Sequence, residues 1–349
     1  MMQISPEIQL FIREHSSDDV RVLALQAKKY PDIDMPTVIT QIAGRKVAAE
    51  KIPSWWEIEK IWYPKHLSLE QCSSEITARY KARLLQGDSL TDLTGGFGID
   101  CSFLATGFKS ATYVERQEEL CEIAAHNFPV LNLNHINIKN EDGVTYLQAM
   151  SPVDCLFLDP ARRNEHGGKT VAISDCEPNV AELEELLLQK ANRVMIKLSP
   201  MLDLSLALKE LKQTQEVHIL SVNNECKELL ILLGQTSPAE ISIHCVNLFT
   251  KGTQKEQHFV FTREQEQCSE CTYTDSLETY LYEPNASLLK AGAFRSIAAA
   301  YPVRKLHPNS HLYTSDTFIE NFPGRIFRIV NQCSFNKNCL LYTSPSPRD

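Results

Sequence analysis

The middle of the chain alternates between short apolar runs and amphipathic stretches. Stretches with apolar residues three and four positions apart lie between the runs, and the clearest extends from Val180 to Leu188. Apolar runs of strand length occur at residues 89–94, 111–115, 134–139, 153–158 and 192–198. Strands that alternate with helices in this way are typical of a parallel sheet with helices on both faces. We therefore predict an α/β fold in which these five strands are parallel.

Two further apolar runs, 217–222 and 229–233, flank a polar turn that is too short to contain a crossover helix. They are predicted to form an antiparallel hairpin at the edge of the sheet. Residues 241–246 and 258–261 predict two more strands, joined by a polar turn. Five parallel strands followed by an antiparallel hairpin differ from the pattern of dinucleotide-dependent dehydrogenases.

The pattern also divides the chain into regions. Residues 1–70 show helical periodicity and predict a helical N-terminal domain. Trp55, Trp56 and Trp62 in this region either stack on nucleic-acid bases or form the core of a small helical domain, and the second interpretation is favoured. The remaining regions are an α/β domain at 71–236, a small β region and linker at 237–283, and an α+β C-terminal module at 284–338.

The last eleven residues, 339–349, resemble the translated read-through of a sequencing-library adaptor. We leave them out of the fold prediction and expect the last domain to be truncated near Asn338.

Composition narrows the class of protein. No apolar run approaches the roughly 18 residues that span a membrane, and the N-terminus lacks the features of a signal peptide, so a cytoplasmic protein is predicted. The eleven cysteines are scattered, many within apolar segments, which favours reduced thiols over disulfides. Cys268 and Cys271 form the only CxxC, without the second pair that a zinc site would need, so no metal site is predicted.

Charge is distributed unevenly along the chain. The net charge is −9, yet residues 285–338 contain seven basic and only two acidic residues. A basic C-terminal module on an acidic body favours contact with nucleic-acid phosphates through that module.

A glycine-rich turn follows the first strand. Gly95, Gly96 and Gly98 permit a tight turn, and the helix that follows directs its N–H groups toward that turn. The dinucleotide fingerprint G-x-G-x-x-G requires a small residue where Cys101 stands. We therefore predict a nucleoside ligand without phosphates, such as S-adenosylmethionine, bound by Thr94, Gly95, Gly96 and Gly98.

Three acidic residues follow the first three strands. Asp92, Glu115 and Asp142 suit an ammonium group, a ribose and an adenine amino group, respectively. Each alone would be an ordinary surface residue, but three at the same edge of a sheet favour a nucleoside ligand. Ser73 and Ser74, before the first strand, either cap a helix or reach a charged end of the cofactor, and both are candidate cofactor-binding residues.

The fourth strand ends in Asp159-Pro160-Ala161-Arg162-Arg163. Here residues 67–234 resemble the class I S-adenosylmethionine-dependent methyltransferases, whose amino-directed members end this strand in Asp/Asn-Pro-Pro-aromatic. The resemblance implies a Rossmann-like sheet in which Asp159 and the Pro160 carbonyl accept hydrogen bonds from an exocyclic amine. Arg162 replaces the aromatic ring, and its guanidinium can stack on a base or hold phosphate. Alternatively, Arg162 and Arg163 form surface ion pairs.

Lys197 and Ser199 end the fifth strand and, with Arg163, are predicted to bind substrate. Together with Gln71–Glu75, these motifs resemble bacterial methyltransferases with a C-terminal THUMP-like domain. That resemblance implies tRNA or rRNA as substrate, methylation of a base nitrogen such as guanine N2, a ferredoxin-like piece at 240–283 and a THUMP-like RNA-binding domain at 284–338. Alternatives are a non-catalytic RNA-binding protein on the same scaffold, a methyltransferase for DNA or protein and, least favoured, an oxidoreductase.

Overall fold

The structure is a computed structural model that describes residues 4–162, 172–236 and 238–332. Its helices are α1 (Pro6–Glu14), α2 (Val20–Leu25), η1 (Ala27–Lys29), α3 (Met35–Lys51), α4 (Pro53–Trp56), α5 (His66–Gln71), α6 (Glu75–Ala82), α7 (Ile99–Ala105), α8 (Glu118–Val130), α9 (Gly143–Ala149), η2 (Ile173–Asp175), α10 (Val180–Lys190), α11 (Leu204–Glu210), α12 (Arg263–Cys268), α13 (Ala286–Ala291) and α14 (Ser296–Ala300). Among the described residues, no helix combines the length and apolar character needed to span a membrane.

The strands fall into one large sheet and two small ones. They are β1 (Ser89–Asp92), β2 (Ser110–Glu115), β3 (Ile136–Asn140), β4 (Val153–Leu158), β5 (Ala161–Arg162), β6 (Cys176–Glu177), β7 (Ala191–Leu198), β8 (Thr214–Val222), β9 (Glu225–Gly234), β10 (Ser242–Leu248), β11 (Glu256–Thr262), β12 (Tyr280–Pro284), β13 (Arg304–Lys305), β14 (Tyr313–Ser315) and β15 (Gly324–Arg328).

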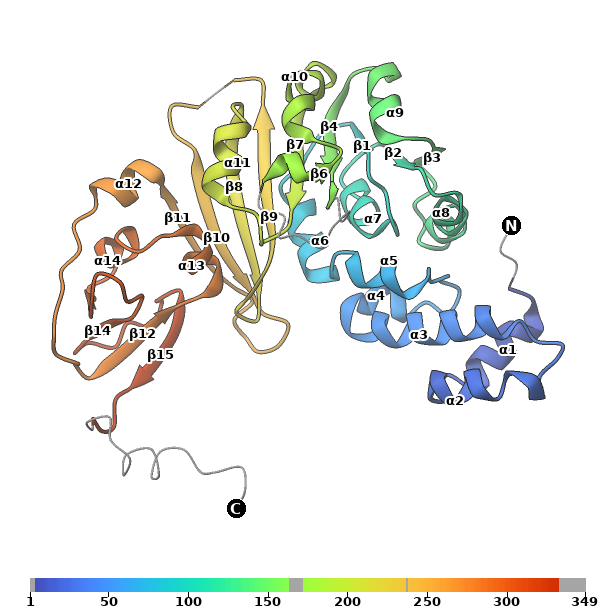
Figure 1. Cartoon of the computed structure of the whole chain (residues 1–349), viewed down its shortest axis with the longest axis horizontal. Helices are drawn as coiled ribbons and strands as arrows, with labels where there is room; N and C mark the ends of the chain where they lie inside the picture. The colour runs from blue at the N-terminus through green and yellow to red at the C-terminus, as the bar shows by residue number, and fades with distance from the viewer. Residues whose placement is uncertain (1–3, 163–171, 237, 333–349) are drawn as a thin grey trace.

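The large sheet has nine strands in the order β11-β10-β8-β9-β7-β4-β1-β2-β3 (Figure 1). The five strands predicted to be parallel are parallel, and β8 and β9 form the antiparallel hairpin. This arrangement confirms the predicted methyltransferase-like α/β fold. The sheet continues beyond the hairpin, however, because β10 pairs with β8 in parallel and β11 pairs with β10. The hairpin is therefore interior, and the β region predicted at 237–283 supplies two strands of the main sheet.

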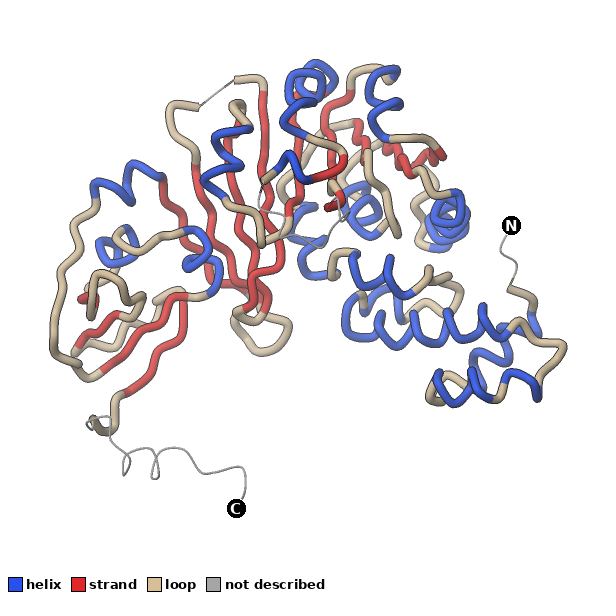
Figure 2. The backbone as a smooth tube through the Cα atoms, in the orientation of Figure 1, coloured by secondary structure: helices blue, strands red, loops and turns tan. Residues whose placement is uncertain are grey.

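Alternating side chains divide the core into two layers. In β4, Cys155 and Phe157 pack into one cluster and Leu156 and Leu158 into the other, as the two-residue period of a strand requires. The first layer contains buried residues of α6, α7 and α8, and the second contains those of α9, α10, α11 and α13. The helices accordingly lie on both faces of the sheet (Figure 2).

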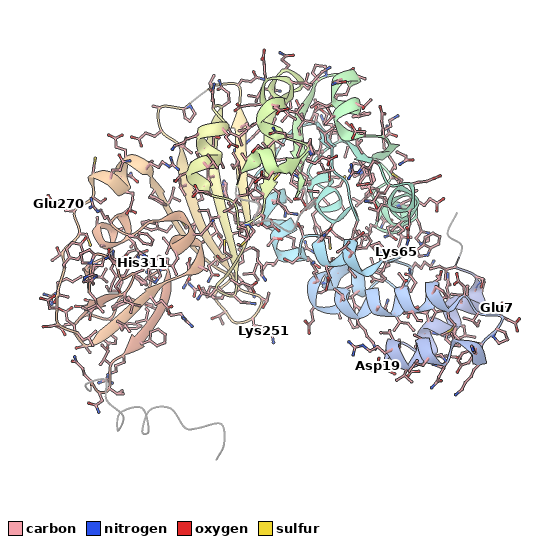
Figure 3. The ribbon with its side chains drawn as sticks, in the orientation of Figure 1. Glu7, Asp19, Lys65, Lys251, Glu270 and His311 are labelled. Atoms are coloured by element: carbon pink, nitrogen blue, oxygen red, sulfur yellow. The ribbon has the colours of Figure 1, made fainter. Side chains whose placement is uncertain are left out.

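The N-terminal helices form a small core of their own and then join the main domain. Leu23, Met35, Val38 and Ile42 make up that separate core, and Figure 3 labels Glu7 and Asp19 in this part of the molecule. Trp55 is buried against Phe97, with 5.2 Å between ring centroids, so it contributes to packing as favoured. Trp62 stacks on His126, whereas Trp56 is 41% exposed.

The C-terminal module is a four-stranded antiparallel sheet in the order β13-β14-β12-β15. It is joined to the large sheet through α13, which packs on β8 and β10. Asn223 and Asn224, at the tip of the β8–β9 hairpin, both have positive φ, which suits the tight turn there. The Asn224 Oδ1 accepts a hydrogen bond of 2.8 Å from the Ala286 N–H at the start of α13. Residues 339–349 lie outside the described residues.

Candidate functional site

A cavity of about 880 Å³ opens at the carboxyl ends of β1, β2, β4 and β7. Ligands of doubly wound sheets bind at this edge. The lining contains most of the residues predicted for cofactor and substrate: Ser73, Asp92, Thr94, Gly95, Gly96, Gly98, Glu115, Asp142, Asp159, Pro160, Lys197 and Ser199. We call this cavity the cofactor pocket.

The glycine turn, from Gly95 to Gly98, forms part of the wall of the pocket. A Cβ on Gly95 would lie 2.2 Å from the Tyr113 ring, so this position requires glycine. Gly96 and Gly98 have φ of 54° and 87°, which favours glycine for its backbone freedom. The Gly96 N–H donates to Glu115 Oε2 at 2.9 Å, which ties the turn to the end of β2.

Asp92 is a buried carboxyl group with one unused oxygen. Its Oδ1 accepts from the Thr94 N–H at 3.0 Å, whereas its Oδ2 has no hydrogen-bond partner among the described residues. Burial raises the pKa of Asp92 well above its ordinary value, and the carboxylates of Asp100, Asp159 and Glu115 raise it further. The pocket therefore contains an acceptor whose charge a cationic ligand group would compensate.

Glu115 and Asp142 hold their loops in place as well as lining the pocket. Glu115 Oε1 accepts from the Gln117 N–H at 2.8 Å, so each of its oxygens already accepts one backbone hydrogen bond. Asp142 Oδ1 caps α9 by accepting from the N–H groups of Val144 and Thr145. A carboxylate has about four lone-pair positions, so both residues retain acceptor capacity for a ligand.

Asp159 lies at the end of β4 with its side chain 35% exposed to the pocket. Its backbone N–H donates to Thr94 Oγ1 at 2.6 Å, and its carboxylate forms an ion pair with Lys197. Burial raises the pKa of Asp159, and the Lys197 ammonium opposes that shift. Burial would lower the pKa of Lys197, but the carboxylates of Asp159, Asp100 and Glu228 raise it above its ordinary value. Lys197 is therefore a cation at neutral pH.

A cluster of buried charges borders the pocket, and sequence reasoning identified only part of it. We call Lys81, Asp100, Asp159, Lys197 and Glu228 the charge cluster. Lys81 is fully buried, with its Nζ 2.9 Å from Asp100 Oδ1 and 2.6 Å from Glu228 Oε2. Lys197 Nζ lies 3.8 Å from Asp100 Oδ2, which connects the two lysines through one carboxylate.

The two lysines of the charge cluster partly compensate its three carboxyl groups. Burial alone would raise the pKa of Asp100, but the ammonium groups of Lys81 and Lys197 and the Ser73 hydroxyl hold it below its ordinary value. The Ser73 hydroxyl donates to Asp100 Oδ2 at 2.7 Å and accepts from Lys81 Nζ at 2.7 Å. Ser73 therefore supports the pocket from within this cluster.

The other predicted residues differ in their placement. Ser74 is the N-cap residue of α6, and its hydroxyl lies 3.2 Å from Thr77 Oγ1. Ser199 Oγ accepts from the Met201 N–H at 3.2 Å at the rim of the pocket. The backbone of Arg162 belongs to β5, which pairs with β6, and Arg163 lies outside the described residues.

The basic C-terminal module has fewer available charges than its sequence indicates. Five of its basic side chains have partners within the protein: Lys290 donates to the Leu202 carbonyl, Lys305 to the Pro308 carbonyl and Arg295 to the Gln267 carbonyl, and Arg304 and Arg325 pair with Glu278 and Glu283. Arg295 and Arg328 are exposed. Glu278 and Glu283 precede residue 285, so a count of charges that begins at residue 285 omits these two acids.

Comparison with known proteins places the chain in a family. A model of a ferredoxin-like domain matches residues 280–323, which include β12, α13, α14, β13 and β14. This ferredoxin-like match overlaps only the last four residues of the piece predicted at 240–283 and otherwise lies in the region predicted to be THUMP-like. No curated protein matches the sequence.

Several solved structures resemble this one in part. A modification subunit of a proposed type I restriction enzyme from Vibrio vulnificus YJ016 is 12% identical, with 58% of this chain and 56% of that chain covered at a TM-score of 0.39. An rRNA methylase from Streptococcus thermophilus is 14% identical, with 46% of this chain and 93% of that chain covered at a TM-score of 0.33. Neither likeness is close enough to carry an argument.

One solved structure resembles nearly the whole chain. It is a proposed methyltransferase from Porphyromonas gingivalis W83, which is 35% identical, with 96% of this chain and 84% of that chain covered at a TM-score of 0.84. At this identity and coverage, the chain belongs to the same family as that protein.

Proposed function

We propose that the protein is an S-adenosylmethionine-dependent methyltransferase that acts on RNA, on a base nitrogen such as guanine N2. The observation that carries the proposal is the meeting of Asp92, Glu115, Asp142 and Asp159 in one pocket beside a glycine turn. The family relationship to a proposed methyltransferase supports it.

The pocket residues fit this cofactor. The unused Oδ2 of Asp92 would accept from the ammonium of the methionine part, because a buried carboxyl oxygen without a partner favours a cationic donor. Glu115 would accept from the ribose hydroxyls and Asp142 from the adenine amino group. Gly95 and Gly96 line the pocket, and their turn would let the backbone approach the ligand closely.

S-adenosylmethionine supplies an electrophilic methyl group, and the electrons of the broken C–S bond remain on sulfur. Asp159 and the Pro160 carbonyl would accept hydrogen bonds from the acceptor amine and direct its lone pair toward the methyl carbon. The proton that the nitrogen then loses passes to solvent, with the Asp159 carboxylate as its first acceptor. Lys197 holds Asp159 in place through their ion pair, so the chemistry depends mainly on positioning.

RNA is the proposed substrate class, and the exposed Arg295 and Arg328 in the C-terminal module support it. Contacts from such side chains to phosphate provide affinity that does not depend on sequence. The ion pairs of Arg304 and Arg325 reduce that affinity, so we expect the pocket rim to contribute to substrate binding. DNA and protein substrates are tested in the same assay.

Two measurements test the proposal. Calorimetry should show S-adenosylmethionine binding that Glu115→Ala weakens at least about tenfold, which is 1.4 kcal/mol; Glu118→Ala, at an exposed position of α8 that does not line the pocket, serves as a matched control. Incubation with methyl-labelled cofactor and total tRNA, rRNA, DNA or protein, followed by mass spectrometry of nucleosides, then identifies the acceptor. RNA binding without cofactor binding would instead establish a non-catalytic RNA-binding protein.

A further inference from the structure

A second group of titratable side chains lies outside the cofactor pocket. Glu216 and His218 on β8, His244 on β10 and His258 on β11 form what we call the histidine cluster. None of them lines the cofactor pocket. Strand alternation places them on the face of the sheet that α6 covers, because the adjacent Val217 and Ile219 belong to the opposite core layer.

The cluster brings three potential metal ligands together. One ligand atom each from Glu216, His218 and His244 lie within 4.8 Å of one another. His218 and His244 are register partners on paired parallel strands, and their rings stack with 4.3 Å between centroids. The backbone of the sheet therefore sets the spacing of the two imidazoles.

Each of these imidazoles has a further partner at Nδ1. The Tyr80 hydroxyl lies 2.8 Å from His218 Nδ1, and His258 Nε2 lies 3.2 Å from His244 Nδ1. In the metal-bound form, a proton on each Nδ1, donated to these partners, would leave Nε2 of both rings free to bind the ion. In the free protein, the contact of His218 Nε2 with the acceptor Glu216 Oε2 places the His218 proton on Nε2, so metal binding would move it to Nδ1. Histidines that bind metals usually donate their other ring N–H to such a group, which fixes the orientation of the ring.

His218 is the strongest sign of a ligand at this position. It is only 2% exposed, and its Nε2 has the single partner Glu216 Oε2, at 3.3 Å, among the described residues. Because this buried nitrogen has only one long contact, it can also coordinate a metal ion.

The composition of the cluster suits a divalent cation. Glu216 Oε1 forms an ion pair of 3.0 Å with Arg193, and Glu216 Oε2 faces His218 Nε2. The set is one carboxylate and two imidazoles, and metal binding requires the imidazoles in their neutral form.

We propose that Glu216, His218 and His244 bind a divalent transition-metal ion, for which Zn²⁺ is the best match, with Tyr80 and His258 as positioning residues. Two imidazoles and one carboxylate are a donor set that zinc accepts with a fourth position left for water, whereas Mg²⁺ and Ca²⁺ favour oxygen ligands throughout. The ion would join β8 to β10 and, through Tyr80, to α6. This inference does not depend on the proposed methyltransferase activity.

The test uses the full chain after removal of metal with a chelator and dialysis. Calorimetry with Zn²⁺ and visible absorption with Co²⁺ should each show one site. Zn²⁺ should also raise the Tm, because an ion that binds only the folded state stabilises it. His244→Ala should weaken Zn²⁺ binding at least about 100-fold and abolish the rise in Tm. His258→Ala should weaken it by about 10- to 100-fold and shift the Co²⁺ spectrum.

Two controls separate this site from other sources of binding. His307→Ala removes an exposed imidazole elsewhere and should leave binding unchanged. Cys268→Ser with Cys271→Ser removes the CxxC pair and should also leave it unchanged. The proposal is overturned if the wild-type protein binds no Zn²⁺, if binding survives His244→Ala, or if it disappears with the cysteines. Circular dichroism of each variant confirms that its fold is retained.

Discussion

The charge cluster and the histidine cluster both contact α6, and each contains a deeply buried side chain, Lys81 and His218, yet they are satisfied in different ways. Adjacent residues of that helix serve the two sites: Lys81 enters the charge cluster and the Tyr80 hydroxyl contacts His218. In the charge cluster, each cation lies between carboxylates and each carboxylate has a cationic partner. In the histidine cluster, Arg193 pairs with one oxygen of Glu216, whereas the ring nitrogens of His218 and His244 contact Tyr80, Glu216 and His258 and no cation among the described residues. Buried charges that pair with one another indicate a structural role, whereas ligand atoms without a cation indicate a place where an ion can bind.

The largest expected effect comes from breaking the internal compensation. Lys81→Met leaves Asp100 and Glu228 buried with less compensating charge, and removal of one partner of a buried ion pair costs about 3 to 5 kcal/mol. Urea unfolding should show this loss. The neighbouring Tyr80→Phe removes only one hydrogen bond and should cost about 1 kcal/mol. Equal losses for the two variants would contradict the distinction between the clusters.

A smaller effect is expected at Asp159, the member of the charge cluster that we propose accepts a hydrogen bond from the substrate amine. Asp159→Ala should lower kcat at least about 100-fold, equivalent to about 2.7 kcal/mol, and leave the cofactor Kd within a few-fold. The fold should tolerate this change because Lys197 keeps Asp100 nearby.

The matched variant Asp159→Asn retains a carbonyl acceptor and should keep more activity than the alanine variant in single-turnover assays. A parallel loss of cofactor binding in Asp159→Ala would mean that this residue belongs to the cofactor site.

The smallest effect concerns Asp92, which resembles the histidine cluster in having an unused ligand atom. Its raised pKa means that the free protein retains a proton there to higher pH than an ordinary aspartate. Bound ammonium favours the carboxylate, so binding releases this proton, and affinity rises with pH by up to about tenfold per unit until the pKa of the free protein is passed.

Calorimetry in buffers of different ionisation enthalpy measures the proton released from Asp92. Asp92→Asn should bind more weakly and release no proton from this position. Proton uptake on binding, or an affinity of the wild type that falls as pH rises, would contradict the assignment.

The sequence indicated which residues meet at this edge of the sheet, because they stand at the ends of strands. Asp92, Glu115 and Asp159 each end an apolar run, and parallel strands present their carboxyl ends at one edge, so local pattern was sufficient to bring them together. The glycine turn is likewise encoded by adjacent residues.

Pairings between distant parts of the chain could not be predicted in this way. Lys81 and Glu228 are 147 positions apart, and their contact depends on the order of strands in the sheet. In the sequence, Lys81 has the pattern of an ordinary polar residue of a helix, and Glu228 stands at the start of an apolar run. The histidines were equally scattered, and only the parallel register of β8 and β10 places His218 beside His244. The pairing of β10 with β8 also joins distant parts of the chain, so the sequence pattern assigned β10 and β11 to a separate region.

The bond between Asn224 and Ala286 has a consequence for cooperativity. The hairpin tip holds the first turn of α13, and α13 in turn fills the outer part of the second core layer. Opening the hairpin would remove the support of this helix, and loss of the helix would expose apolar surface of β8 and β10. The ferredoxin-like module and the outer half of the sheet should therefore lose amide-exchange protection together, as one unfolding unit.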